Sequence, residues 1–174
     1  MEIRDVRPEE YAEAGRVTAL AYREYAPPES KGWREYLGQI ADVAGRAERT
    51  PVLIAVEDGR IVGTATVEID EPVEEHESDR LLPEEGGLRM LGVDPAYRGR
   101  GIGRALVEAS RERIQAAGKT VMALRTTAPM TTAQALYTSM GFVRDPSRDW
   151  ADETVSLLFF RLPLTKAGEA RAQA

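Results

Sequence analysis

A glycine-rich turn between a predicted strand and a predicted helix constrains the fold of this chain more than any other feature. The apolar run 88–93 and the Asp94-Pro95 turn come before it. The string Arg98-Gly99-Arg100-Gly101-Ile102-Gly103 follows and opens directly into an amphipathic stretch, residues 104–117. Backbone N–H groups point outward at the start of a helix, and the helix dipole favours an anion there. The arrangement therefore predicts a phosphate-binding turn.

Two common phosphate motifs do not fit this turn. The dinucleotide fingerprint needs a small residue where the helix meets the strand. Counting from Gly99 or Gly101, that position holds Arg104 or Leu106, so a nicotinamide-dependent oxidoreductase is poorly supported. The tripeptide 118–120 resembles the end of a P-loop. However, the leading glycine of that motif is replaced by an arginine, and the tripeptide leaves a helix instead of entering one.

Periodic patterns along the chain predict strands that alternate with helices. Strand pairs joined by short turns must be antiparallel, so the sheet is mixed. We expect an α/β (α+β) fold with a mixed central β-sheet of about six to seven strands, flanked by helices on both faces. Residues 1–165 should form a single domain with a flexible C-terminal tail, 166–174. The expected strands are 3–6, 52–56, 61–69, 88–93, 120–126, one from 142, and 155–162; the expected helices are 8–25, 30–44, 102–117 and 131–140, and 70–85 is expected to be a long acidic loop.

The composition excludes several classes of function. Without Cys, the chain has no disulfide, thiolate metal ligand or Cys nucleophile. The single histidine, His76, lies among glutamates and is expected at the surface, so no metal is expected. A net charge of −6 argues against nucleic-acid binding. No apolar run is long enough to span a bilayer and the N-terminus is charged, which predicts no membrane contact and a cytoplasmic location.

The turn does fit a third pattern. Arg98-x-x-Gly101-x-Gly103 at a strand–turn–helix junction resembles motif A of the GNAT family of N-acetyltransferases. The wider string 88–106 is also similar to that motif. A second family motif, Ala-Gln-Ala-Leu-Tyr-Thr-Ser-Met-Gly-Phe at 133–142, follows at the expected distance. The order of predicted elements agrees from Ile3 onward, so the resemblance covers nearly the whole chain and implies a GNAT-like sheet.

The resemblance implies an acetyl-CoA-dependent N-acyltransferase, with acetyl-CoA as co-substrate and a primary amine of a small molecule or peptide as acceptor. Relatives are often dimers, so a homodimer is possible. A splayed strand would pair with the amides of the pantetheine arm, and backbone amides of the turn would hold the diphosphate. The implied cofactor contacts are Leu91, Gly92 and Val93 on the strand, and Arg98, Gly99, Arg100, Gly101, Ile102, Gly103 and Arg104 in the turn.

Acetyl transfer to an amine needs a proton acceptor for the amine, a donor for the oxyanion and a proton for the departing thiolate. Without Cys, a cysteinyl acyl-enzyme is excluded, which favours direct attack in a ternary complex. The N–H of Val93 or a neighbour would polarise the thioester carbonyl. The resemblance places Tyr137 near the CoA sulfur, so Tyr137 is the candidate general acid. Its helical spacing also fits a core aromatic.

The general base is less directly marked. Many family members carry a glutamate at the start of the central strand, where this chain has Gly87. Glu84 and Glu85 lie just upstream, and Glu85 is the candidate base; the alternative is that both are solvated loop charges. Met130 replaces an asparagine that the family often carries three residues before the alanine of its second motif. These departures leave open a catalytically weak CoA-binding sensor or regulatory module.

Overall fold

The computed structural model describes residues 1–25, 31–70, 80–151 and 156–164. The expected tail 166–174 and His76 lie outside the described residues. The chain separates into two compact units. The first unit comprises Met1–Val67 and Met90–Ser110, and the second comprises Glu68–Arg89 and Arg111–Ala174. None of the described helices combines the length and the apolar character needed to cross a membrane.

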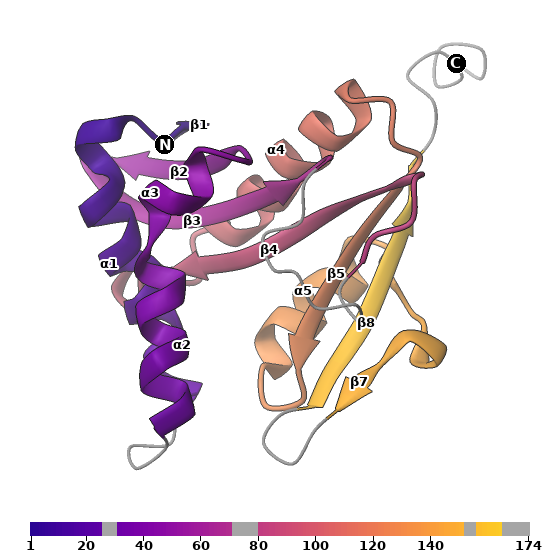
Figure 1. Ribbon diagram of the computed structural model, residues 1–174. Coiled ribbons are helices and arrows are strands. Elements are labelled where there is room, and N and C mark those ends of the chain that lie inside the picture. The colour runs from indigo at the N-terminus through magenta and orange to yellow at the C-terminus, as the bar shows by residue number, and fades with distance from the viewer. Residues whose placement is uncertain (26–30, 71–79, 152–155, 165–174) are drawn as a thin grey trace. The chain divides into compact units, whose positions relative to one another are not determined.

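The described strands form one eight-stranded sheet (Figure 1). The hydrogen-bonded order is β1-β2-β3-β4-β5-β8-β6, and β7 pairs with β8. Strands β4 and β5 are parallel, whereas β1–β2, β2–β3, β5–β8, β6–β8 and β7–β8 are antiparallel. The predicted mixed sheet is therefore confirmed. The bounds are β1 Glu2–Asp5, β2 Val52–Glu57, β3 Arg60–Glu68, β4 Glu85–Val93, β5 Val121–Thr127, β6 Val143–Arg144, β7 Trp150–Ala151 and β8 Ser156–Pro163.

The turn between β2 and β3 follows from its sequence. Asp58 and Gly59 both have positive φ, 50° and 75°. This is the backbone of the two-residue turn that matches the right-handed twist of paired strands, and Asp-Gly is a preferred sequence for it. The predicted hairpin is confirmed.

The helices of the first unit begin and end close to the predicted positions, with one exception. The predicted helix 30–44 is interrupted at Asp42, whose carboxylate accepts a hydrogen bond from Gly45 N–H at 3.0 Å. This side chain caps a new helix start, and the chain therefore forms two helices there. The helices are α1 Tyr11–Tyr22, α2 Lys31–Ala41, α3 Val43–Ala47 and α4 Ile102–Ala116, the last continuing into the second unit.

Helices cover both faces of β3 in the first unit. Thr64 Oγ1 lies 2.7 Å from Thr18 Oγ1 on α1. A Cβ on the preceding residue, Gly63, would lie 2.9 Å from Leu106 and 3.0 Å from Ile102, both on α4. Because successive strand residues point to opposite faces, α1 and α4 lie on opposite sides of the sheet, as predicted.

The second unit packs helices against one face of its strands. On α5, Thr131–Ser139, the ring of Tyr137 lies 6.2 Å from that of Phe160 on β8 and 5.7 Å from that of Phe142. A Cβ on Gly86 of β4 would lie 2.6 Å from Ile114 on α4. Phe159, next to Phe160 along β8, faces the opposite side, where the guanidinium groups of two arginines lie over its ring.

Candidate functional site

Strand β4 changes its pairing and its backbone conformation halfway along its length. It pairs in parallel with β5 from Glu85 to Leu88, and Met90 then has a φ of +51°. A non-glycine residue at positive φ is uncommon and makes a strand locally irregular. The pairing with β5 ends at Leu88, and Asp94 N–H donates to Val62 O of β3 at 2.9 Å. An extended, amide-bearing ligand can pair with such a strand edge.

The glycine turn after β4 leaves room for a ligand against its backbone. Gly99 and Gly101 have φ of +78° and +80°, and apart from their chain neighbours no atom of the described structure lies within 4 Å of where their Cβ atoms would stand. The first N–H groups of a helix have no acceptor within it. Here Ala105 N–H donates to Gly101 O at 3.0 Å, and the donors before it, from Ile102 onward, belong to the open first turn. This cradle fits a diphosphate.

Arg98 fastens the turn to helix α1. Its guanidinium lies 2.5 Å from the carboxylate of Glu24 and donates to Ala21 O at 3.2 Å. A Cβ on Gly92, one strand residue before Val93, would lie 3.0 Å from the Cβ of Ala21, so the glycine permits this close approach of helix and strand. The side chain of Arg98 is thus used inside the protein, and its predicted cofactor contact concerns its backbone N–H.

Two further arginines lie at the turn with exposed side chains. Arg100 pairs with Glu57 at 3.2 Å, and its guanidinium lies 5.0 Å from the centre of the Tyr97 ring. Arg104 is exposed in the first turn of α4. A cation at a helix start is unfavourable because that end of the helix dipole is positive. A bound anion there would attract both the helix end and the guanidinium groups. Both residues remain predicted diphosphate contacts.

Tyr137 is buried in the second unit. Its residue surface is 5% exposed, and its ring packs against those of Phe142 and Phe160. This burial raises the pKa of the Tyr137 phenol above its ordinary value. The phenol therefore keeps its proton at neutral pH. Burial agrees with both interpretations of Tyr137, general acid and core aromatic, so the catalytic role stays a prediction.

Glu85 lies in β4 and not in the predicted loop. It is only 3% exposed, its Oε1 pairs with Arg148, and its Oε2 accepts from Leu82 N–H at 2.9 Å. The interpretation of Glu85 as a solvated loop charge is therefore wrong, whereas Glu84 is exposed. The sequence did not predict that β4 starts at Glu85, because glycines, which are poor strand formers, follow at positions 86 and 87.

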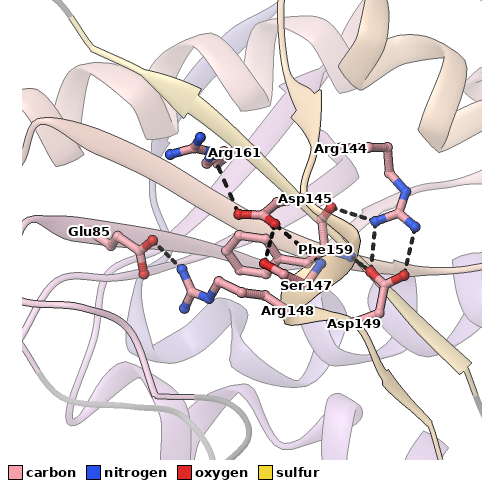
Figure 2. A network of polar contacts seen from close by, with 8 residues as sticks. All are labelled: Glu85, Arg144, Asp145, Ser147, Arg148, Asp149, Phe159 and Arg161. Atoms are coloured by element: carbon pink, nitrogen blue, oxygen red, sulfur yellow. Dashed lines mark hydrogen bonds and ion pairs between the residues drawn. The ribbon is translucent and has the colours of Figure 1, made fainter.

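An ion-pair network holds Arg148 in place (Figure 2). The guanidinium of Arg148 lies 4.0 Å from the centre of the Phe159 ring. Arg144 donates twice to Asp149, each time at 2.7 Å, and Asp149 accepts from Phe159 N–H at 2.8 Å. These contacts fix the short turn Pro146–Arg148 against β8. Sequence reasoning missed the network, for which the alternating charges of 144–149 were the only local signal.

A small pocket in the second unit was also missed. Its lining includes Glu68, Gly87, Phe159 and Leu81. Glu68 ends β3, is 3% exposed, and its Oε2 lies 2.7 Å from where a Cβ on Gly87 would stand. The sequence carries one signal for this pocket: Glu68 is a charged residue near the end of the predicted strand 61–69, directly before the acidic segment. In the described ranges, no three or more His, Asp or Glu side chains gather as a metal site.

The fold and these sites together define a class of protein. A strand that stops pairing with its parallel neighbour, followed by an open glycine turn at a helix start, suits a ligand that has both a diphosphate and an amide-bearing arm. Coenzyme A thioesters have this composition. The model of the Acetyltransferase (GNAT) family matches residues 15–142. The chain belongs to the GNAT acetyltransferase family, which confirms the resemblance, and enzymes of this family use acetyl-CoA as co-substrate.

Known relatives cover part of the chain at moderate identity. The chain is 34% identical over 94 residues to mycothiol acetyltransferase of Sanguibacter keddieii, covering 53% of this chain and 28% of that protein. It is 45% identical over 65 residues to the N-alpha-acetyltransferase RimI of Mycobacterium tuberculosis, covering 37% of this chain and 39% of RimI. The chain therefore spans less than half the length of these two relatives.

Solved structures agree in fold over nearly the whole chain. A Salmonella typhimurium protein solved with its cofactor acetyl-CoA has a TM-score of 0.67 and 20% identity, covering 95% of this chain and 94% of that one. Identity at this level shows a shared fold.

Proposed function

We propose that this protein is an acetyl-CoA-dependent N-acetyltransferase that acts on a primary amine of a small molecule or peptide. The observation that carries the proposal is the continuity of one segment, 91–104. Within it, an incompletely paired strand end leads into an open turn with positive-φ glycines at the start of α4. A thioester arm and a diphosphate are adjacent in coenzyme A, and this segment offers adjacent backbone partners for both.

The binding roles follow from backbone chemistry. Amides of Leu91, Gly92 and Val93 would pair with the pantetheine arm. The N–H groups from Arg98 to Arg104 would hold the diphosphate. Exposed guanidinium groups at the turn would add charge-assisted contacts to phosphate oxygens.

The chemical roles require one proton donor and one proton acceptor. Tyr137 is the proposed donor to the departing thiolate, because its phenol keeps its proton at neutral pH, where burial raises its pKa. Two buried glutamates of the second unit, Glu68 and Glu85, are the described carboxylates suited to take a proton from the amine. The chain has no Cys, so the amine would attack the thioester directly in a ternary complex.

The names of the relatives support two acceptor classes. RimI is an N-alpha-acetyltransferase, which supports a peptide amine, and the mycothiol enzyme supports a small molecule. A cytoplasmic location, expected because no apolar run of the sequence is long enough to span a bilayer, is part of the same proposal.

A panel assay tests the function. The purified chain is incubated with acetyl-CoA and amines: free amino acids, tripeptides with free N-termini, polyamines and amino sugars. Acceptor-dependent release of CoA thiol, with the acetylated amine found by mass spectrometry, is the expected result. Calorimetric binding of CoA without turnover on any acceptor would contradict the enzymatic proposal.

CoA binding without turnover would favour the alternative function, a catalytically weak CoA-binding sensor or regulatory module. One observation supports this alternative. Met130 is buried, and its sulfur accepts a hydrogen bond from the hydroxyl of Thr126 at 3.6 Å. The side chain at this position therefore packs inward and offers a cofactor no polar contact.

A further inference from the structure

We infer that Glu24 is a positioning residue for the cofactor turn: by holding the guanidinium of Arg98, it raises the affinity for CoA from outside the turn. This inference rests on the proposed function and deepens it, because it names a residue that prepares the diphosphate site. It stands on the contacts of the Arg98 side chain, on the backbone to either side of that residue, and on a second carboxylate, Glu57, at the same turn.

The side chain of Arg98 is engaged on three sides, all within the first unit. Its Nη1 lies 2.5 Å from a carboxylate oxygen of Glu24, its Nη2 donates to Ala21 O at 3.2 Å, and its Nε donates to Val93 O at 3.4 Å. Ala21 lies near the C-terminal end of α1, where the helix dipole is negative and favours a cation. One guanidinium therefore joins the end of α1, the end of β4 and Glu24.

The backbone of Arg98 lies between a closed turn and two glycines. Before it, the short turn Pro95–Tyr97 donates a backbone hydrogen bond to the carboxylate of Asp94 at 2.9 Å. After it, Gly99 and Gly101 both have positive φ, and an added Cβ at either would have no described atom within 4 Å apart from chain neighbours. Glycine loses more conformational freedom on ordering than any other residue. The Arg98 side chain is thus an anchor placed directly before the most adaptable part of the turn.

An anchored turn should bind a ligand more tightly than a loose one. A turn that is already ordered loses less conformational freedom when the ligand binds. A turn that holds the binding geometry for only a fraction of the time binds more weakly by that fraction. Glu24 fixes the direction of the Arg98 guanidinium, and so favours one arrangement of the backbone N–H groups that follow.

The neighbouring arginine of the turn is held differently. The side chain of Arg100 is 56% exposed and pairs with Glu57 of β2 at 3.2 Å. Arg100 is a predicted direct contact of the diphosphate, and a carboxylate bound to its guanidinium competes with a phosphate for the same donors. The two carboxylates should therefore act in opposite directions on CoA binding: Glu24 supports it through Arg98, and Glu57 opposes it at Arg100.

The alternative is that the guanidinium of Arg98 binds the diphosphate itself. Glu24 would then compete with the ligand, and its removal would strengthen binding. The loss of any negative charge near an anion site also favours the anion. Weaker binding in Glu24→Gln is therefore opposite in sign to both effects, and it is the result expected of a positioning residue alone.

The test measures CoA binding by calorimetry at one fixed salt concentration. The proteins compared are the wild type, Glu24→Gln, the matched variant Glu57→Gln, Arg98→Met, and the double variant of Glu24→Gln with Arg98→Met. The KM for acetyl-CoA, kcat with the best amine of the panel and the thermal midpoint are measured in parallel. Each glutamate variant removes one negative charge that is paired with one arginine of the turn.

For Glu24→Gln we expect CoA to bind about twofold to fivefold more weakly, which is the size of a partly exposed ion pair. The KM for acetyl-CoA should rise by the same factor, with kcat at saturation unchanged within about twofold. Glu57→Gln should strengthen CoA binding. In the Arg98→Met background, Glu24→Gln should no longer weaken binding, because two residues that act through one contact are not additive.

Three results would overturn the role of Glu24 while the proposed function stands: CoA binding by Glu24→Gln that equals or exceeds the wild type, equal weakening by Glu24→Gln and Glu57→Gln, or a loss that persists in the Arg98→Met background. If Arg98→Met does not fold, the opposite signs of the two glutamate variants decide the question by themselves. Absence of CoA binding by the wild type overturns the proposed function itself, and the inference falls with it.

Discussion

A Cβ added to Gly87 would stand 2.7 Å from Oε2 of Glu68. The buried carboxylate of Glu68, on β3, therefore lies against the place that a side chain at position 87 of β4 would fill. Gly87 pairs with Ala123 on the other side, inside the parallel part of β4. The glycine therefore controls where the carboxylate of Glu68 can lie.

The variant Gly87→Ala should accordingly lower catalysis more than binding. The methyl group would displace the flexible end of Glu68, and displacements near 1 Å cost about 10²-fold in rate. We expect kcat to fall between about 10-fold and 10²-fold, with CoA affinity unchanged by calorimetry. The matched control is Gly38→Ala on α2, where the new Cβ would have no described atom within 4 Å apart from its chain neighbours and the backbone of its own helix. Equal rates for Gly87→Ala and Gly38→Ala would contradict the prediction.

Tyr137→Phe removes the predicted proton donor and keeps the ring that packs on Phe142 and Phe160. If Tyr137 is the only acid, kcat should fall by roughly 10²–10⁴-fold with little change in CoA affinity. Steady-state kinetics and calorimetry measure the two quantities. Unchanged turnover would leave Tyr137 as a core aromatic only.

The two ends of α4 provide a matched pair of glycines. Gly101 precedes the helix and Gly118 follows it. Both have a φ of +80°, and apart from chain neighbours no described atom lies within 4 Å of an added Cβ atom. Alanine at either position must adopt a left-handed backbone, which costs about 1–2 kcal/mol of stability. Only at Gly101 would the methyl also occupy the cradle predicted for the diphosphate.

We therefore expect Gly101→Ala and Gly118→Ala to lower the free energy of unfolding by similar amounts in urea titrations. Gly101→Ala alone should weaken CoA binding, by about 10-fold or more, which corresponds to about 1.4 kcal/mol. Equal CoA affinity in the two variants would show that the diphosphate lies elsewhere.

Features that depend on local chemistry were predictable from the sequence. The Asp58-Gly59 hairpin and the glycine turn at α4 follow from residues that sit next to one another, since positive φ and helix starts have short sequence signatures. The start of β4 was not predictable in this way, because its glycines carry no strand pattern and are held there by pairing with Met122 and Ala123 of β5.

The chemistry of the second unit depends on residues far apart in the chain. Arg148 and Glu85 are separated by 63 positions, and the Glu68–Gly87 contact joins different strands. A single sequence does not show which residues that are far apart in the chain come into contact. For the same reason the sequence points to Glu85 as a base without showing its partner, and it does not distinguish Glu68 from the acidic segment that follows.

The ion pair between Glu10 and Arg4 predicts how stability changes with acid. The hydrogen bonds from Arg4, at 2.7 Å each, and from Arg7 N–H lower the pKa of Glu10 from its ordinary value of 4.5 to about 2. A lowered pKa in the folded state means that the stabilisation is present above pH 4.5 and is lost as the pH falls toward 2.

Glu10→Gln should therefore be less stable than the wild type at neutral pH, by about 1 kcal/mol for a partly exposed pair. The two unfolding free energies should converge as the pH falls from 4.5 to about 2. Glu9→Gln, at the exposed neighbouring position, should match the wild type throughout. A constant difference between Glu10→Gln and wild type at every pH would contradict the linkage.

The pair of Arg148 and Glu85 predicts non-additive effects on stability. Arg148→Met leaves the carboxylate of Glu85 buried without its cation, which should lower the free energy of unfolding by about 3–5 kcal/mol. The double variant Arg148→Met with Glu85→Gln should recover much of this loss, because a neutral amide still accepts from Leu82 N–H and no charge is left buried. Arg161→Met in the same network removes only an exposed contact to Asp145 at 3.8 Å, and should cost less than about 1 kcal/mol. Urea titrations of the wild type, both single variants and the double variant close the cycle; additive losses would show that Arg148 stabilises the fold by stacking on Phe159 and not through the charge of Glu85.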